Sequence, residues 1–254
     1  MKKLLINNMS KVRIYIPEEE IGDNLRIEDR EILHKIKDVL ALKASEKIYI
    51  FNGMGREYAY EIKDVSRHCV SLTNQQLNRG IKETKNKIIL AVPLLKEQKI
   101  EYILERATEL GVERFQPFIC ERSIREKPSK GKMKRWGRII EEATRQSDRL
   151  WIPKIEEPLG FDDLIKKDFN TKMCASIEGK HIKDIQVRNL EEILLMVGPE
   201  GDFSPQELVK MKNCDFNFMK LADNILSVET ASIFMVGLVN YMFELNSSEN
   251  KEKF

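Results

Sequence analysis

Apolar and polar residues alternate in several short stretches within the first 75 residues, which is the pattern of half-buried β-strands. We expect strands over residues 12–16, 47–51, 57–62 and 68–73. One helix should interrupt them, because apolar residues recur there at helical spacing behind a capping aspartate. These residues are Asp29, Ile32, Leu33, Ile36, Val39 and Leu40.

The segment Asn52-Gly53-Met54-Gly55 lies between two of these strands and predicts a hairpin turn, in which glycine supplies the backbone freedom. A dinucleotide-binding loop is the alternative for the two glycines. It is disfavoured because the third glycine of that motif is missing and no helix follows.

Strands and helices alternate from Lys87 onward, which predicts an α/β domain with a parallel sheet. The expected strands are 88–95, 112–118, 173–177, 193–197 and 216–219. The expected helices are 96–110, 132–146, 161–166, one starting at 205, and 228–245. The chain then divides into a β-rich domain over 1–74, a polar linker over 75–86, an α/β domain over 87–246 and a frayed tail over 247–254.

The chain has 254 residues, of which 42% are hydrophobic, enough for a sizeable core. Its longest apolar stretch, Ile233 to Val239, is shorter than the roughly 20 residues that span a bilayer. The apolar run at the N-terminus is too short for a signal peptide. We therefore expect a cytoplasmic protein without a membrane segment.

Cysteine and histidine spacing gives no sign of a metal site. The four cysteines have no CxxC pairing, and no two of the three histidines have the spacing of helical metal ligands. We therefore expect buried free thiols and no metal.

Basic residues cluster in one segment, although the formal net charge is only +2. Between Arg122 and Arg138 there are eight basic residues and a single acid, Glu126. Such a cluster suits contact with a phosphate backbone, and a solvated loop and helix face is the alternative.

A glycine loop, Val197-Gly198-Pro199-Glu200-Gly201, follows the apolar strand 193–197. The next helix is well marked, since Ser204, Pro205 and Glu207 form a capping box with proline at the first helical position. Open α/β sheets bind ligands at the carboxyl ends of their strands. Taken alone, this segment fits a ligand loop and an ordinary strand-to-helix turn equally well.

A second loop, residues 221–227, joins the strand 216–219 to the long helix 228–245, which Ser227 can cap. Loops on two consecutive parallel strands should lie side by side. Together they could sandwich an adenine ring and bond its edge through backbone groups. This pairing favours the ligand-loop interpretation.

The segments VGPEGDFSPQE and LADNILSVETA resemble the paired GPEGG and LG-x-RILR-x-ETA signatures of the RsmE family. That family consists of SPOUT methyltransferases that methylate uridine at ring nitrogen 3 in 16S ribosomal RNA. The segments ERATELGVERFQPFICERS (105–123) and RWGRIIEEATRQSDR (135–149) are similar to two further family segments, and 34–58, with FNGMGREY, looks like the family's small N-terminal domain. The resemblance covers nearly the whole chain in order.

The resemblance implies a PUA-like β-barrel domain that binds RNA, followed by a SPOUT domain knotted as a trefoil. It also implies a homodimer, S-adenosylmethionine as the cofactor, and 16S ribosomal RNA of the small subunit as the partner. The implied cofactor-binding residues are Val197, Gly198, Pro199, Glu200, Gly201, Leu221, Ala222, Ile225, Leu226, Ser227, Thr230 and Ala231.

Methylation at nitrogen 3 needs a base or a group that stabilises the uridine anion, and we consider Glu229 and Ser227 for that step. A helix-dipole partner is the alternative role of Glu229. Arg145 and Arg149 should share a helix face, because they are four residues apart. The expected RNA-binding residues are Arg122, Arg125, Lys134, Arg135, Arg138, Arg145, Gln146 and Arg149.

The chain departs from the family pattern at four positions. Ser227 and Ala41 stand where the family has arginine, Asp202 replaces the second glycine of GPEGG, and Ala222 replaces the glycine of LG. Asp202 should be benign, because aspartate tolerates a left-handed backbone. The lost arginines keep two alternatives open: a SPOUT methyltransferase with another RNA target, or a weakened cofactor- and RNA-binding protein of ribosome assembly. A Rossmann-type methyltransferase is disfavoured, since no glycine-rich loop follows the first strand of the α/β domain.

Overall fold

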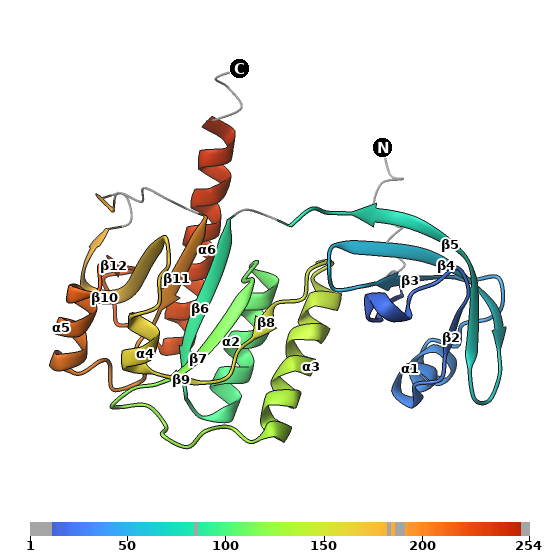
Figure 1. The fold of residues 1–254 in the computed structure, drawn as a ribbon, viewed down its shortest axis with the longest axis horizontal. Helices are drawn as coiled ribbons and strands as arrows, with labels where there is room; N and C mark the ends of the chain where they lie inside the picture. The colour runs from blue at the N-terminus through green and yellow to red at the C-terminus, as the bar shows by residue number, and fades with distance from the viewer. Residues whose placement is uncertain (1–11, 84–85, 182–183, 186–190, 250–254) are drawn as a thin grey trace. The chain divides into compact units, whose positions relative to one another are not determined.

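The computed structural model describes residues 12–83, 86–181, 184–185 and 191–249. The chain forms two compact units (Figure 1). The N-terminal unit comprises Met1–Glu83 together with Asp148–Ile152, and the C-terminal unit comprises Thr84–Ser147 and Pro153–Phe254.

The N-terminal unit is built on a five-stranded sheet in the order β1-β3-β4-β5-β2, in which β1 and β3 pair in parallel and the other neighbours are antiparallel. Its strands are β1 Arg13–Tyr15, β2 Leu25–Ile27, β3 Lys47–Phe51, β4 Arg56–Val65 and β5 Val70–Gly80. Its helical turns are η1 Glu18–Glu20, α1 Arg30–His34 and η2 Lys35–Val39. Isoleucines from the helices and strands, among them Ile36, Ile48 and Ile50, fill one apolar core.

Two local predictions for this unit are confirmed, and one is wrong. The Asp29 carboxylate accepts a hydrogen bond from the Ile32 amide at 2.9 Å and caps α1. Residues 52–55 form the turn between β3 and β4. The expected linker over 75–86 is strand as far as Gly80, because β5 pairs with β4 along most of its length and its polar residues face solvent.

The segment Asp148–Ile152 completes the N-terminal unit from far along the chain. The Gly55 amide donates to the Leu150 carbonyl at 3.0 Å, and the Trp151 indole donates to the Ile81 carbonyl at 3.1 Å. Gly55 has a φ of +92°, and a Cβ there would lie 2.4 Å from the Ile81 oxygen and 2.7 Å from the Trp151 ring. Glycine is therefore required for the tryptophan to approach the turn.

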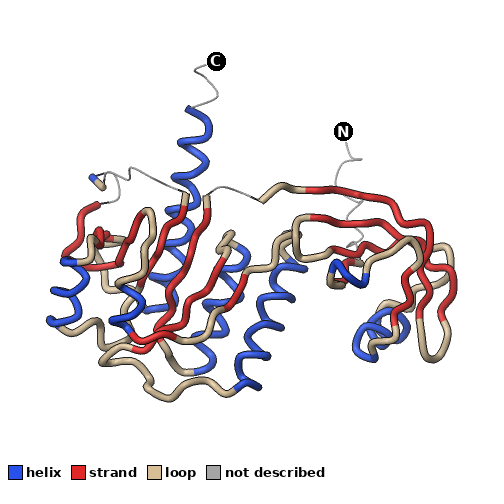
Figure 2. Tube along the Cα trace, viewed as in Figure 1, coloured by secondary structure: helices blue, strands red, loops and turns tan. Residues whose placement is uncertain are grey.

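The C-terminal unit contains a parallel sheet in the order β12-β10-β11-β6-β7-β8, with β9 also paired to β7 (Figure 2). Its strands are β6 Lys87–Pro93, β7 Arg114–Ile119, β8 Lys154–Ile155, β9 Leu159–Gly160, β10 Thr171–His181, β11 Glu192–Met196 and β12 Phe216–Lys220. Its helices are α2 Glu97–Glu109, α3 Lys130–Gln146, α4 Phe161–Ile165, α5 Pro205–Asn213 and α6 Val228–Glu249.

The α/β class with a parallel sheet is confirmed, because every strand pair of this sheet is parallel. Strands β6 and β11 are almost wholly buried, as expected for strands covered on both faces. Helices α4 and α5 contribute Phe161, Leu164 and Met211 to the core on one face. The short strands β2, β8 and β9 were missed by the sequence pattern, which carries no periodicity over two or three residues.

Helix α6 is the one helix of the described residues that is long and apolar enough to cross a membrane, over Val228–Leu245. The uninterrupted apolar stretch 233–239 is shorter than the apolar part of α6, because single polar residues such as Ser232 and Asn240 interrupt the sequence without ending the helix. In the structure α6 packs against β6, β11 and α2, with Met235, Val236 and Val239 fully buried. It also extends to Glu249 into the expected tail, whose remainder lies outside the described residues.

A buried carboxylate holds the N-terminal unit together. The Glu57 side chain has no exposed surface and pairs with the guanidinium groups of Arg13 at 2.6 Å and Arg79 at 2.9 Å. Arg79 in turn binds Asp148 at 2.6 Å, and Arg13 donates to the Arg149 carbonyl at 2.8 Å. Burial by itself raises the pKa of Glu57, but the hydrogen bonds from Arg79 and Arg13 outweigh it and lower the pKa. This network therefore ties the segment 148–152 to β1, β4 and β5.

Replacing Glu57 with glutamine should destabilise the N-terminal unit by about 3 kcal/mol at neutral pH, because the buried Arg13 would lose its buried counter-charge and keep only the half-exposed Asp148, 3.3 Å away. Since the folded-state pKa of Glu57 is lowered, its contribution is present above the unfolded pKa of about 4.3 and is lost as the pH falls through the folded value. Hydrogen exchange of the β3 and β4 amides at several pH values measures both effects.

Glu28→Gln is the matched control. Glu28 pairs with Arg26 at 2.8 Å, but both side chains are exposed, so the change should cost less than about 1 kcal/mol. Equal effects of the two substitutions, or no dependence of the Glu57→Gln effect on acid pH, would contradict the role assigned to Glu57.

Candidate functional site

A cavity of about 560 Å³ opens at the carboxyl ends of four adjacent parallel strands, β12, β10, β11 and β6. Each strand leads into part of its wall. The segment 175–177 belongs to β10, the loop 197–202 follows β11, the loop 221–228 follows β12, and Lys99 lies in α2 after β6. The parallel arrangement brings these distant segments to one edge, where open α/β sheets bind ligands.

The glycine loop after β11 is held by its own backbone and by the helix that follows. Ser204 and Glu207 form the predicted capping box of α5, with the Ser204 amide 2.9 Å from the Glu207 carboxylate. Asp202 has a φ of +57°, and its carboxylate accepts from the Phe203 amide at 2.7 Å. The expectation that aspartate is tolerated there is confirmed. A Cβ at Gly198 would lie 2.8 Å from the Asp202 carboxylate, so a side chain there would displace the oxygen that accepts from the Phe203 amide.

Arg122 lies against this loop. Its guanidinium donates to the Gly201 carbonyl at 2.6 Å, and its aliphatic stem fills the space that a Cβ at Gly201 would need. The neighbouring Glu121 amide donates to the Glu207 carboxylate at 2.9 Å. Arg122, which the sequence assigns to RNA, therefore supports the glycine loop.

Ser227 caps α6 as the sequence predicts. Its hydroxyl accepts from the Thr230 amide at 3.2 Å and lies 3.0 Å from the Thr230 hydroxyl. Ile225, by contrast, is 84% exposed on the same loop. The hydroxyl of Ser227 is thus committed to the helix terminus, while the residue itself forms part of the cavity wall.

Eleven of the twelve expected cofactor residues line the cavity, and Thr230 is the exception. The sequence pattern missed further wall residues, namely Lys99, Ala175, Ser176, Ile177, Asp202, Asn224 and Val228. For Lys99 a signal was available, because it lies in the first turn of the helix that follows a buried strand. Recognising it required knowing that β6 pairs with β11.

Lys99 joins the two loops. Its ammonium lies 3.1 Å from a Glu200 carboxylate oxygen and 3.3 Å from Oε1 of Glu229. The second oxygen of Glu229 is buried and has no hydrogen-bond partner among the described residues. The hydrogen bond to Glu200 is the largest cause that raises the pKa of Lys99; partial burial opposes it and Glu229 reinforces it. Lys99 is therefore protonated at neutral pH.

The expected RNA-binding residues fall into separate surroundings. Arg135 pairs with Glu101 at 2.7 Å, and both Arg145 and Gln146 bind Glu142 on the same helix. Arg135, Arg138 and Gln146 line a groove of about 330 Å³ along α2 and α3. Lys134 is exposed on α3, and Arg125 is exposed in the preceding loop.

The expected shared helix face of Arg145 and Arg149 is wrong. Helix α3 ends at Gln146, and Asp148 has a left-handed φ of +63°, which turns the chain out of the helix. Arg149 belongs to the N-terminal unit and Arg145 to the C-terminal unit.

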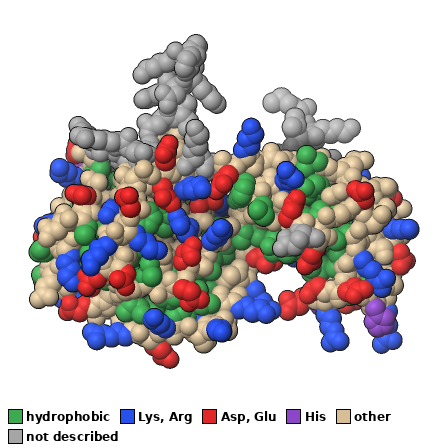
Figure 3. Space-filling model, viewed as in Figure 1, with side chains coloured by type: hydrophobic (Ala, Val, Ile, Leu, Met, Phe, Trp, Pro, Cys, Tyr) green, Lys and Arg blue, Asp and Glu red, His purple; other side chains and the backbone are tan. Residues whose placement is uncertain are grey.

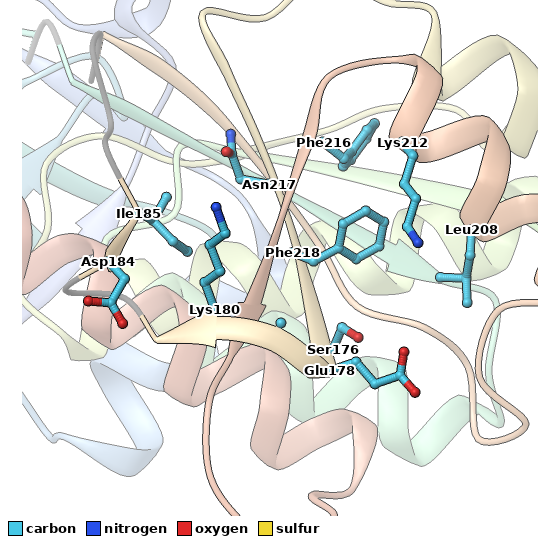
Figure 4. A pocket seen from close by; sticks show the side chains of 11 residues that line it. Ser176, Glu178, Lys180, Asp184, Ile185, Leu208, Lys212, Phe216, Asn217 and Phe218 are labelled. Atoms are coloured by element: carbon cyan, nitrogen blue, oxygen red, sulfur yellow. The ribbon is translucent and has the colours of Figure 1, made fainter.

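A second cavity of about 570 Å³ lies over β10, β12 and α5 and shares Ser176 with the first. In Figure 4, Phe216 and Phe218 point to one side of β12, toward Lys212 and Leu208, while Asn217 points to the other. Its charged side chains have both signs, so the cavity indicates no class of ligand. Acidic and basic side chains are likewise interspersed on the face drawn in Figure 3. Among the described residues, no group of His, Cys, Asp and Glu side chains is arranged to hold a metal ion.

Known proteins are similar to this chain in both sequence and fold. The RNA methyltransferase domain family matches residues 82–240. Ribosomal RNA small subunit methyltransferase E of Rickettsia conorii is 31% identical over 243 residues, which cover 91% of this chain and 95% of that protein. The protein of the same name from Bacillus subtilis is 29% identical, over 85% of this chain and 89% of its own.

Two solved structures with bound S-adenosylmethionine have the same architecture. A methyltransferase of Legionella pneumophila superposes with a TM-score of 0.82 at 28% identity, and ribosomal RNA small subunit methyltransferase E of Neisseria gonorrhoeae with 0.81 at 25%. Each alignment covers 91% of this chain and 98% of the other. The chain therefore belongs to the ribosomal RNA small subunit methyltransferase E family within the RNA methyltransferases, as its paired loop motifs indicated.

Proposed function

We propose that the protein transfers a methyl group from S-adenosylmethionine to ring nitrogen 3 of a uridine in 16S ribosomal RNA of the small subunit, in the cytoplasm. The observation that carries this proposal is that the glycine loop and the loop before α6 line one and the same cavity. Relatives named as small-subunit ribosomal RNA methyltransferases, and two related structures that hold S-adenosylmethionine, support it.

The cavity residues suit this cofactor. The volume of about 560 Å³ is within the range of small-molecule sites, roughly 300–1,000 Å³. Apolar side chains such as Val197 and Leu226 can cover a flat adenine, and the backbone of both loops can bond its edge. The carboxylates of Glu200 and Asp202 suit a cationic sulfonium. When bound, S-adenosylmethionine supplies an electrophilic methyl group.

The chain's own residues orient the cofactor and the uridine, and we assign none of them the role of an acid or a base. Methylation replaces the proton on uracil nitrogen 3, which passes to solvent, and leaves S-adenosylhomocysteine as the second product. Ser227 lines the cavity, but its hydroxyl is used by the cap of α6. Glu229 pairs with Lys99 and is not part of the cavity wall, so we assign it an orienting role. Alignment of the two loops should then supply much of the rate.

RNA recognition is assigned to the basic residues and to the N-terminal unit. The target edge of uracil is used in base pairing, so the nucleotide must be unpaired or flipped out. We assign the five-stranded sheet of the N-terminal unit to a PUA-like RNA-binding domain, and the segment from β11 to α6 to the trefoil knot of a SPOUT domain. The support is the family membership and the convergence of both loops on one cavity.

The serine at 227 favours two alternatives, another RNA target or a protein with weakened catalysis. Incubating the purified protein with methyl-labelled S-adenosylmethionine and undermethylated small subunits separates all three. We expect label in 3-methyluridine of 16S RNA, identified by nucleoside mass spectrometry. Cofactor binding without transfer would contradict the proposed activity, and label in another RNA would contradict the substrate.

We further propose a homodimer through α6. One side of this helix packs on the sheet, while Phe234, Tyr241 and Leu245 are exposed along another side at spacings of seven and four residues. An apolar stripe of this kind on a helix marks an interaction surface. A second copy of the chain is the occupant that we propose, since it would cover the apolar side chains that the monomer leaves in water.

The double substitution Phe234→Asp with Tyr241→Asp should convert the dimer into a monomer in sedimentation velocity. Each aromatic side chain buried in an interface contributes about 2–3 kcal/mol, so the dissociation constant should rise at least about a hundredfold. Val209→Asp, at an exposed apolar position of α5, is the matched control and should leave the mass unchanged. A wild-type monomer, or a dimer that survives the double substitution, would contradict this interface.

Replacing Lys134 and Arg138 with glutamine should weaken binding to small subunits and lower the slope of log affinity against log salt by about one to two. The reason is the loss of up to two phosphate contacts. Binding of S-adenosylmethionine, measured by calorimetry, should not change, since neither residue lines the cofactor cavity. Lys210→Gln on α5, where Lys210 pairs with Asp162, is the control. An unchanged salt slope would remove these residues from the RNA surface.

A further inference from the structure

Lys99 is the one basic side chain among the described residues that line the cofactor cavity. It comes from α2, whereas its two carboxylate partners come from the glycine loop and from the first turn of α6. Among the ion pairs of the described residues, this is the one in which a shared cation joins the glycine loop to the first turn of α6. The contact therefore links α2 to two segments that follow it by about a hundred residues or more in the sequence.

The charges around Lys99 make the approach of the glycine loop to the first turn of α6 depend on this ion pair. Glu200 is half-exposed, but Glu229 is largely buried, with one oxygen fully inaccessible and unbonded. The amino end of α6 compensates part of the charge on Glu229. Without the ammonium of Lys99, the carboxylates of Glu200 and Glu229 would repel each other across the cavity rim. Water could solvate Glu200 but could not reach the buried oxygen of Glu229.

We propose that Lys99 is a positioning residue that clamps the glycine loop to the first turn of α6 and so sets the shape of the S-adenosylmethionine pocket. This inference rests on the proposed function for the identity of the cofactor. It assigns to α2, which contributes no other residue to the cavity wall, the task of holding the two loops in register. It also gives Glu229 its role, since Glu229 orients the lysine rather than acting on substrate.

The test compares Lys99→Met, Lys99→Arg and the control Lys96→Met in the full-length protein. Lys96 is exposed, precedes α2 and does not line the cavity. Calorimetry measures the dissociation constant of S-adenosylmethionine, and methyl transfer to small subunits gives kcat and KM for the cofactor. For Lys99→Met we expect the dissociation constant and KM to rise about tenfold, as for the loss of a charged hydrogen bond, while kcat at saturating cofactor falls less than about threefold. Lys99→Arg should recover most of the affinity, and Lys96→Met should match the wild type.

A double-mutant cycle distinguishes a clamp from direct contact with the cofactor. In the background Glu200→Gln with Glu229→Gln the repulsion between the loops is absent, so Lys99→Met should change the affinity less than about threefold. An undiminished tenfold effect in that background would overturn the clamp, and so would wild-type affinity of Lys99→Met. Should Lys99→Met fail to fold, Lys99→Arg and the glutamine background still report the coupling through cofactor binding. A protein that binds the cofactor with this coupling but methylates no small subunit would refute the proposed function and leave the clamp intact.

Discussion

The parallel pairing of β12, β10, β11 and β6 is the constraint on which the rest of the C-terminal unit depends. Because all four strands run the same way, their carboxyl ends meet at one edge of the sheet, and the segments that follow them lie together at that edge. The glycine loop, the loop before α6 and the first turn of α2 thus become neighbours. The two inner strands, β6 and β11, are almost wholly buried, so the loops start from the well-packed centre of the sheet.

Both units hold distant segments together in the same way, with one charged side chain between two side chains of the opposite charge. In the N-terminal unit the buried carboxylate of Glu57 lies between Arg13 and Arg79, and the network reaches the segment after α3. In the C-terminal unit the ammonium of Lys99 lies between Glu200 and Glu229. The former is fully buried and serves stability, whereas the latter is partly exposed at a cavity rim, where it can define the shape of a pocket.

Two of the four departures from the family pattern, Asp202 and Ser227, are accommodated by local hydrogen bonds. Asp202 occupies a left-handed position and uses its carboxylate to bind the next amide, so it replaces glycine without strain elsewhere. Ser227 gives the cavity no charge, but it caps α6 through the Thr230 amide. Nothing in the structure explains Ala41, which has a left-handed φ of +50° without a side chain that could compensate for it. Lys99 is the one basic side chain among the described residues of the cavity wall, and it is paired with two carboxylates.

Several features could be predicted before the structure was known: the caps at Asp29, Ser204 and Ser227, the turn at 52–55, the α/β class and the two loops of the cavity. The caps and the turn depend on residues within a few positions of one another, while the α/β class and the two loops follow from the alternation of strands and helices and from the paired motifs. Three features could be seen only in the folded chain. Lys99 pairs with Glu200 and Glu229, Arg122 donates to the Gly201 carbonyl, and Arg149 belongs to the N-terminal unit. The first two depend on the strand order of the parallel sheet, and the third depends on the contacts of the segment 148–152 with β1 and the turn 52–55.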